Sequence, residues 1–182
     1  GQIEKISSKL QKHQVDKNRA VSVAGEKFSI IFNTNDGKTV RVIKRKAAGE
    51  YINAIARDLE IKAKYGTFSL GQFAGFDLSI VHDIGGCTIQ LIGNAIYKAS
   101  VKKTPMGTIS ALEHCVNSGI DKELKQAENQ LQKLKQAEKD LSIQKNQPFS
   151  KAAELEAVIK EQSALNKELG LVEEDVEVID KE

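Results

Sequence analysis

The sequence predicts an α+β fold in which a small antiparallel sheet with one packed helix is followed by an antiparallel helical (coiled-coil) hairpin. Short segments between residues 26 and 104 alternate apolar and polar residues, and glycine-containing turns separate them. The last third carries two heptad-spaced apolar stripes on either side of Pro148. The chain therefore divides into an N-terminal helix and linker (residues 1–25), an α+β module (26–104), a helical hairpin (105–170) and an acidic tail (171–182) predicted to be disordered.

The first elements are a short helix and a β-hairpin. Residues 3–14 show helical spacing of apolar side chains, and residues 15–25 are polar, as in a linker. Residues 27–34 then place Phe28, Ile30 and Phe32 on one face of a strand and Ser29, Ile31 and Asn33 on the other, and residues 39–43 return as a second strand. The Asp-Gly pair between them favours the positive φ of a tight hairpin turn.

The rest of the module begins with a helix. From Ala47 the apolar residues recur with helical spacing, and Gly66 ends this region. Four short strand candidates follow, at residues 67–70, 73–81, 87–92 and 95–101. We predict a β-β-α-β-β-β module with the helix packed on the sheet.

The hairpin prediction depends on the two heptad stripes. A short helix at residues 108–117 precedes arms at about 120–145 and 148–169, and Pro148 suits the first turn of the second arm. The residues predicted to form the hairpin core are Leu124, Leu131, Leu134, Leu141, Leu155, Leu165 and Leu169. Such a hairpin is typical of an arm or a docking surface.

Composition narrows the class of protein. The chain has 182 residues, and no apolar run is long enough to span a bilayer, so we expect a cytoplasmic protein without a membrane partner. Residues 1–105 carry 17 basic and 9 acidic residues (17 − 9 = +8), whereas residues 106–182 carry 10 and 16 (10 − 16 = −6). This excess of positive charge in residues 1–105 favours contact with a polyanion, although an uneven distribution of surface charge also explains it.

Cys87 and Cys115 are predicted to be free buried thiols rather than a disulfide.

No catalytic motif is present. The glycines at 66 and 71 lack the lysine of a phosphate-binding loop, and the three histidines lie far apart with no zinc-binding spacing. Residues 146–149 (Asn-Gln-Pro-Phe) are one substitution from the signature of adenine-N6 methyltransferases, but they lie between two helical stripes, which favours a connector. We therefore predict no catalytic residue, no cofactor and no metal.

One basic cluster is a candidate binding site. It consists of Lys38, Arg41, Lys44, Arg45 and Lys46, around the second strand and the start of the following helix. These side chains are suited to phosphate groups of DNA, and a solvated strand end is the alternative.

Residues 65–78 are similar to a G-x-Y/F-x-G-F strand pair, and residues 146–169 are similar to a closing segment K-P-F-x-x-E-x-E-L … L-N-x-L-L. Together with residues 48–50, these segments resemble the C-terminal region of very large helicase–adenine-N6 DNA methylase proteins of phages, plasmids and conjugative elements. The likeness covers most of residues 25–175. It implies a setting of DNA modification on mobile elements, but both catalytic regions of those proteins lie upstream of this segment.

The expected function is that of a non-catalytic module that engages DNA or docks the upstream domains of a parent chain. The alternative is a structural or oligomerisation module that binds protein, or a second copy of itself, through the hairpin. A stand-alone enzyme is the third and weakest hypothesis.

Overall fold

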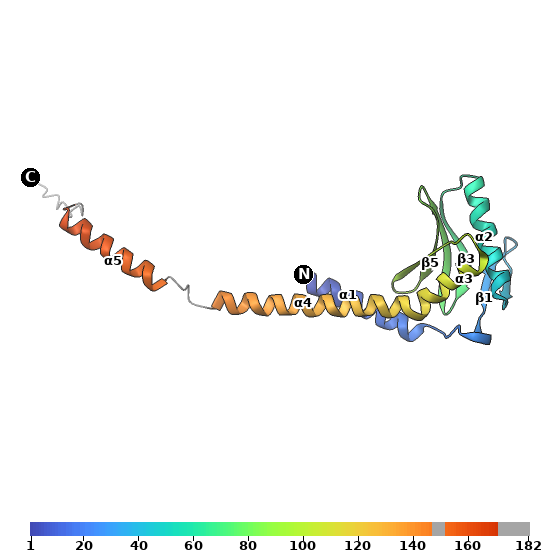
Figure 1. The fold of residues 1–182 in the computed structure, drawn as a ribbon, viewed down its shortest axis with the longest axis horizontal. Coiled ribbons are helices and arrows are strands. Elements are labelled where there is room, and N and C mark those ends of the chain that lie inside the picture. Colours follow the sequence, from blue (N-terminus) through green and yellow to red (C-terminus); the bar gives the residue numbers. More distant parts are fainter. Residues whose placement is uncertain (147–151, 171–182) are drawn as a thin grey trace, which may run out of the picture. The chain divides into compact units, whose positions relative to one another are not determined.

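The computed structural model describes residues 1–146 and 152–170 and confirms the α+β fold (Figure 1). The chain divides into two compact units, residues 1–135 and 136–182. In chain order the elements are α1 (Gln2–Arg19), a 3-10 turn (Gly25–Lys27), β1 (Ile30–Asn33), β2 (Thr39–Val42), α2 (Arg45–Ile61), β3 (Gly66–Phe73), β4 (Phe76–Asp83), β5 (Gly86–Ile92), β6 (Ile96–Ser100), α3 (Pro105–His114), a π-helical segment (Cys115–Gly119), α4 (Ile120–Asn146) and α5 (Ala152–Glu168). The unit boundary falls within α4.

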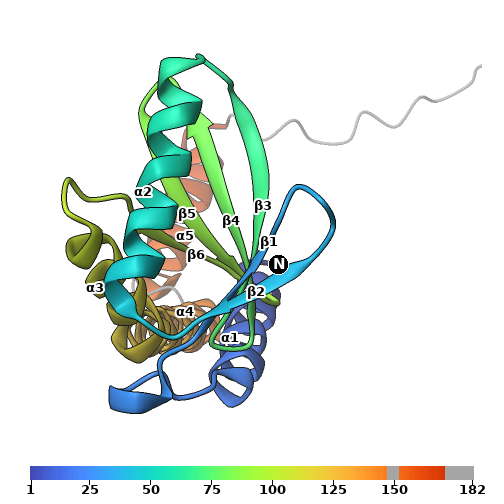
Figure 2. The same cartoon turned by 90° about the vertical axis from the view of Figure 1, so that its right-hand side faces the viewer.

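The sheet has six antiparallel strands in the order β2-β1-β3-β4-β5-β6, so β2 and β6 are its edges. The predicted β-β-α-β-β-β outline was one strand short, because all four strand candidates after the helix enter the sheet. Alternate residues of β4, such as Phe76, Leu78 and Ile80, are fully buried on one face. Figure 2 shows α2 lying across a face of the sheet. Helix α2 buries Ala48, Ile52, Ala56 and Leu59, which share one helical face.

The turn between β3 and β4 differs from the prediction. The break was expected at Gly71, but Gly71 lies inside β3 at an irregular position in the β3–β4 register. Its φ is +142°, and an added Cβ would lie 1.9 Å from the carbonyl oxygen of Ile31. A glycine that lets a neighbouring strand approach closely looks like a turn residue in the sequence. The turn is made instead by Ala74 and Gly75, both with positive φ.

Helix α1 packs beside α4 in the first unit (Figures 1 and 2). It continues to Arg19, so the first part of the predicted linker is helical. Ion pairs join Lys9 to Glu123 and Lys17 to Asp121, with N···O distances of 3.3 and 2.9 Å.

The helix expected at residues 108–117 begins at Pro105 and continues without a break into the next helix. Pro105 occupies its first turn, and the Thr104 hydroxyl accepts a hydrogen bond from the Gly107 N–H at 3.1 Å. The π-helical segment then joins α3 directly to α4. A single helical run with one irregular turn therefore replaces the two separate helices of the prediction.

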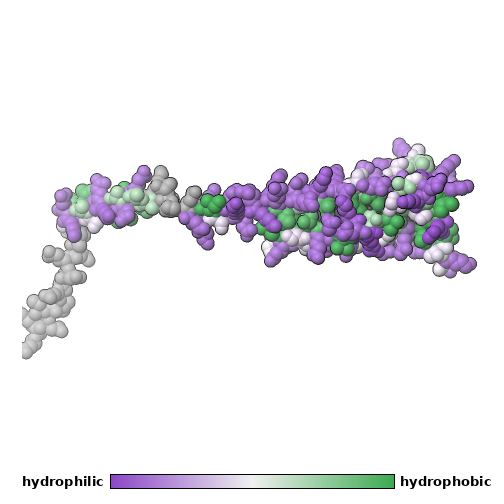
Figure 3. Space-filling view, turned by 90° about the horizontal axis from the view of Figure 1, so that it is seen from below, coloured by the Kyte–Doolittle hydropathy of each residue, from purple (hydrophilic) through white to green (hydrophobic). Residues whose placement is uncertain are grey.

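The second unit contributes the C-terminal part of α4 and all of α5. Both helices of the predicted hairpin are present, and the connector at residues 147–151 lies outside the described residues. Every described residue of α5 is exposed, and Figure 3 shows apolar side chains at its surface. Pairing of α4 with α5 stays a prediction. Within residues 1–146 and 152–170, no helix is long and apolar enough to cross a membrane.

Candidate functional site

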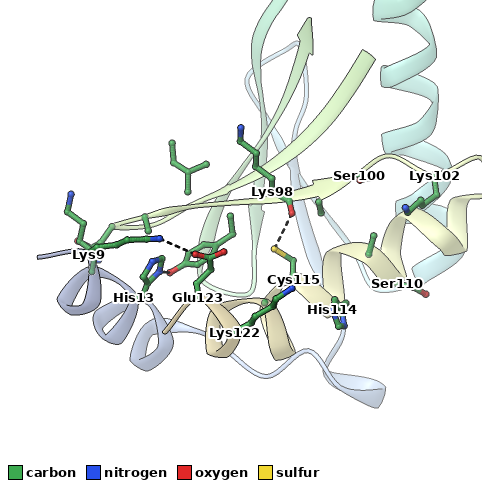
Figure 4. A pocket seen from close by; sticks show the side chains of 18 of the residues that line it. Lys9, His13, Lys98, Ser100, Lys102, Ser110, His114, Cys115, Lys122 and Glu123 are labelled. Carbon is green, nitrogen blue, oxygen red and sulfur yellow. Dashed lines mark hydrogen bonds and ion pairs between the residues drawn. The ribbon is translucent and has the colours of Figure 1, made fainter. Parts of the chain in front are cut away.

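A groove of about 1060 Å³ follows the edge strand β6 (Figure 4). Its other walls come from α1, α3, the π-helical segment and the start of α4. Every residue from 94 to 100 lines it, so it extends along the whole strand. Six lysines line the groove: Lys5, Lys9, Lys12, Lys98, Lys102 and Lys122.

Local structure explains why these lysines meet. The three on α1 have the spacing i, i+4 and i+7, which puts them on one helical face. Lys98 lies between the buried Tyr97 and Ala99 on β6, so its side chain points to the opposite, exposed face of the sheet. Lys122 lies in the first turn of α4. Three elements of the first unit, α1, β6 and α4, and the loop after β6, which carries Lys102, therefore bring positive charge to one groove.

The groove has little compensating negative charge. Among the described lining residues, Glu123 is the single carboxylate, and it pairs with Lys9. In the described part of the chain, none of the other five lysines has a carboxylate oxygen within 4.0 Å of its Nζ. Positive charges that surround a groove attract anions and raise the local concentration of those anions.

Buried Asp16 holds α1 against the β5–β6 turn at one end of this groove. Its Oδ1 accepts the Asn94 N–H at 2.7 Å and its Oδ2 accepts the Ala95 N–H at 2.8 Å. The Asn94 amide and the Tyr97 hydroxyl donate two further hydrogen bonds, each 3.0 Å long. Burial alone would raise the pKa of Asp16, but these hydrogen bonds outweigh it and hold the pKa below its usual value. Asp16 is therefore an ionised structural anchor.

His13 continues the same hydrogen-bond chain. Burial, followed by the hydrogen bond to Asp16, raises the pKa of Tyr97, so its hydroxyl stays protonated and donates a hydrogen bond to Asp16 Oδ2. The Tyr97 oxygen must then accept from His13 Nδ1, 2.8 Å away. Burial and the nearby Lys9 lower the pKa of His13, which leaves Nε2 as a bare acceptor. Nε2 is buried and has no partner in the described structure, and in Figure 4 His13 lies below the Lys9–Glu123 pair.

Cys115 is the only thiol that lines the groove among the described residues. Its Sγ lies 3.7 Å from the Lys98 carbonyl oxygen. Burial raises the pKa of this thiol to about 11, so it is an inert donor rather than a nucleophile. Cys87 and Cys115 are both free, as predicted, but only Cys115 is buried, and Cys87 is half-buried.

Four of the five residues in the basic cluster predicted from the sequence are exposed. Lys38 lies in the β1–β2 turn and pairs with Asp36 at 2.9 Å. Arg41 is an exposed residue of the edge strand β2. Lys44 and Lys46 are exposed at the start of α2. These four side chains are available for phosphates, and their role in DNA binding stays a prediction.

Arg45, the fifth member of that cluster, is engaged within the fold. Its Nε donates to Glu113 at 2.7 Å, and its Nη2 donates to the carbonyl oxygens of Val23 and Gly25 at 3.3 and 3.0 Å. The guanidinium carbon lies 4.8 Å from the centre of the Phe28 ring. Arg45 therefore joins α2, α3 and the segment before β1, and it has little capacity left for a ligand.

The predicted hairpin core separates into two groups. Leu124 is buried, Leu131 and Leu134 are half-buried, and all three belong to the first unit, where α1 runs beside α4. The others are each exposed by about half or more: Leu141, Leu155, Leu165 and Leu169.

Sequence reasoning missed the lysine-lined groove because its residues are scattered from position 5 to position 122. The lysine spacing on α1 was a detectable signal, but nothing in the sequence shows which elements α1 faces. Of the methylase-like string, residues 147–149 lie outside the described part, so its interpretation as a connector stays a prediction. No protein-family model matches the chain, and no curated protein or solved structure is detectably similar to it. The groove and its charges are therefore the basis for a function.

Proposed function

We propose that the chain is a non-catalytic module that engages DNA through phosphate contacts made by the groove lysines. The observation that carries this proposal is that six lysines from three elements and one loop surround one groove, against a single carboxylate among the described lining residues. Lysines of this kind contribute sequence-independent affinity by displacing counterions from phosphates. The resemblance to helicase–methylase proteins supports the same context, and in it this chain is an accessory module beside the catalytic regions.

Two charge-matched variants test which surface binds. The groove variant is K12E/K98E/K122E, and the cluster variant is R41E/K44E/K46E, which changes the net charge by the same amount. We expect fluorescence anisotropy with labelled single- and double-stranded DNA to show binding that weakens steeply with salt. The groove variant should lose about two to three phosphate contacts, and hence reduce the slope of log affinity against log salt by about 2. The cluster variant should bind within about twofold of the wild type.

Loss of DNA binding only in the cluster variant would place the DNA-binding site at the basic cluster predicted from the sequence. No binding of either DNA form at low salt would overturn the proposal. Circular dichroism of both variants controls for folding.

The exposed apolar residues of α5 favour a second candidate function, self-association. Leu155, Val158 and Leu165 are each about half exposed and fit the heptad stripe. If helices of separate chains pair through this stripe, sedimentation velocity should show a mass that rises with protein concentration. L155E/L165E should then remain monomeric, whereas the surface control E156K/E161K should still associate. A wild-type chain that stays monomeric at high concentration contradicts this function.

A further inference from the structure

His13 carries a buried ring nitrogen that the fold leaves unpaired. The residue is 3% exposed, and its Nε2 has no hydrogen-bond partner among the described residues. The same residue lines the lysine-lined groove. Buried polar atoms are nearly always paired, because an unpaired one keeps the full cost of leaving water. An exception in the wall of a groove that attracts anions indicates that this nitrogen has a role there.

The other ring nitrogen of His13 has a fixed role. The Tyr97 hydroxyl donates to ionised Asp16 at 3.0 Å, so the Tyr97 oxygen accepts from His13 Nδ1 at 2.8 Å. Nδ1 therefore carries a hydrogen whether the imidazole is neutral or positively charged, and only Nε2 gains or loses a proton. Protonation leaves this chain of hydrogen bonds intact, and the negative charge of Asp16 favours a positive ring.

Two side chains of opposite charge act on His13 from the groove side. Lys9 opposes a positive ring and Glu123 favours one, but the two are paired with each other at 3.3 Å. Both are about half-exposed, and in Figure 4 their pair lies above His13. Exposed pairs of this kind are weak, so a bound anion can replace Glu123 as the partner of Lys9. The titratable groups around the ring are Lys9 and Asp16 on α1, Tyr97 on β6 and Glu123 on α4, with Cys115 of the π-helical segment acting on Tyr97.

We propose that His13 takes up a proton from solvent at Nε2 when an anion binds the groove lysines. The anion becomes the partner of Lys9, and Glu123 transfers to the new Nε2–H of His13. The charge that opposed a positive ring is then neutralised, and the carboxylate that favours it is released, so both changes act in the same direction. That the anion is a DNA phosphate rests on the proposed function, whereas the proton uptake does not.

Reciprocal linkage gives the sign of the resulting pH dependence. In the free protein, burial and then Lys9 hold the pKa of His13 below its usual value, so the ring is neutral at pH 7. An anion that raises this pKa binds more tightly to the protonated protein. Its affinity should rise as the pH falls from the pKa of the bound state to that of the free state, and should be level outside this window.

The first test needs no ligand and follows the imidazole signals of the full chain by NMR during a pH titration. We expect K9M to raise the pKa of His13 by about one pH unit, because Glu123 is then free to pair with the ring. K17M is the matched control, since Lys17 makes the other ion pair between α1 and α4, with Asp121, and does not line the groove. The control should leave the pKa of His13 unchanged. Equal titration of His13 in K9M and the wild type would overturn the proposal.

The second test uses two anions whose charge does not change with pH, namely dextran sulfate and DNA without terminal phosphates. We expect both to bind the wild type more tightly by about threefold or more when the pH falls from about 7.5 to about 5.5. H13N should lose most of this gain, because an amide can still donate to Tyr97 but does not titrate. H114N should keep most of it, although His114 is an exposed histidine that lines the same groove. An equal gain in H13N and the wild type would contradict the proton uptake at His13.

A direct measurement on the wild type does not depend on how the variants fold. Saturating dextran sulfate should raise the pKa of His13 in the NMR titration, and an unchanged pKa would overturn the proposal. If dextran sulfate binds with proton uptake and DNA does not bind, the proposed function is wrong and this inference stands. If DNA binds with the same pH dependence in the wild type and H13N, the reverse holds. If neither anion binds, both are wrong.

Discussion

Replacing Asp16 with alanine should lower the free energy of unfolding by about 3–5 kcal/mol. Asp16 is fully buried and accepts hydrogen bonds from two backbone N–H groups, one amide and one hydroxyl. Alanine leaves these donors unpaired, and each buried unpaired donor costs about 1–3 kcal/mol, with partial relief where water enters. Urea unfolding followed by circular dichroism measures the change. Asp58→Ala is the control, because Asp58 makes an exposed pair with Lys62, and exposed pairs contribute about 0–1 kcal/mol.

The same carboxylate should make the fold sensitive to acid. Because hydrogen bonds hold the folded-state pKa of Asp16 below its unfolded value, ionised Asp16 stabilises the fold above the unfolded pKa. That stabilisation is lost as the pH falls below about 4 and through the folded-state pKa. Asp16→Asn should lack this component, so its stability should fall less steeply in acid than that of the wild type. An alanine variant that loses less than about 1 kcal/mol would show that Asp16 does not anchor α1.

Gly49→Ala should destabilise the protein, although Gly→Ala inside a helix usually stabilises it by about 0.5–1 kcal/mol. Gly49 lies in α2 and faces the first residue of α3, Pro105. An added Cβ would lie 2.2 Å from the Pro105 carbonyl oxygen. The next nearest atoms are also Pro105 backbone, at 2.6 and 2.9 Å, so no side chain can swing aside. We expect a loss of about 2–3 kcal/mol, as in overpacked cores.

Thermal unfolding compares Gly49→Ala with Glu50→Ala, an exposed neighbour on the same helix. The control should change the stability by no more than about 0.5 kcal/mol. A stabilised Gly49→Ala variant would mean that α2 and α3 do not approach each other closely at this point.

The sequence was sufficient for elements whose pattern is local. Phe28, Ile30 and Phe32 occupy alternate positions on one face of a predicted strand, all three are buried, and the last two lie in β1. The sequence was insufficient where the conformation or the contacts of a residue depend on a partner that is distant in the sequence. Gly71 looked like a turn residue because its requirement comes from the Ile31 carbonyl on the neighbouring strand.

The candidate site shows the same limit. Arg45 sits between two lysines in the sequence and looked like part of a solvated basic face, but its partner Glu113 lies on another helix. Conversely, Lys5 and Lys122 share a groove only because α1 packs beside the start of α4. Heptad spacing placed Leu124 correctly in a buried stripe, but spacing carries no information on which helix covers it.

The docking of α1 also has a consequence for the order of events during synthesis. Lys9 pairs with a residue 114 positions later, and Asp16 bonds to a turn 78 positions later. At about 5–20 residues per second, a ribosome needs about 6–23 s to supply Glu123 after Lys9. Until then α1 lacks the surface that it packs against, and most of the stability of a protein helix comes from the packing of its amphipathic face. Although it is translated before the sheet, α1 is therefore among the last parts of the first unit to reach its final place.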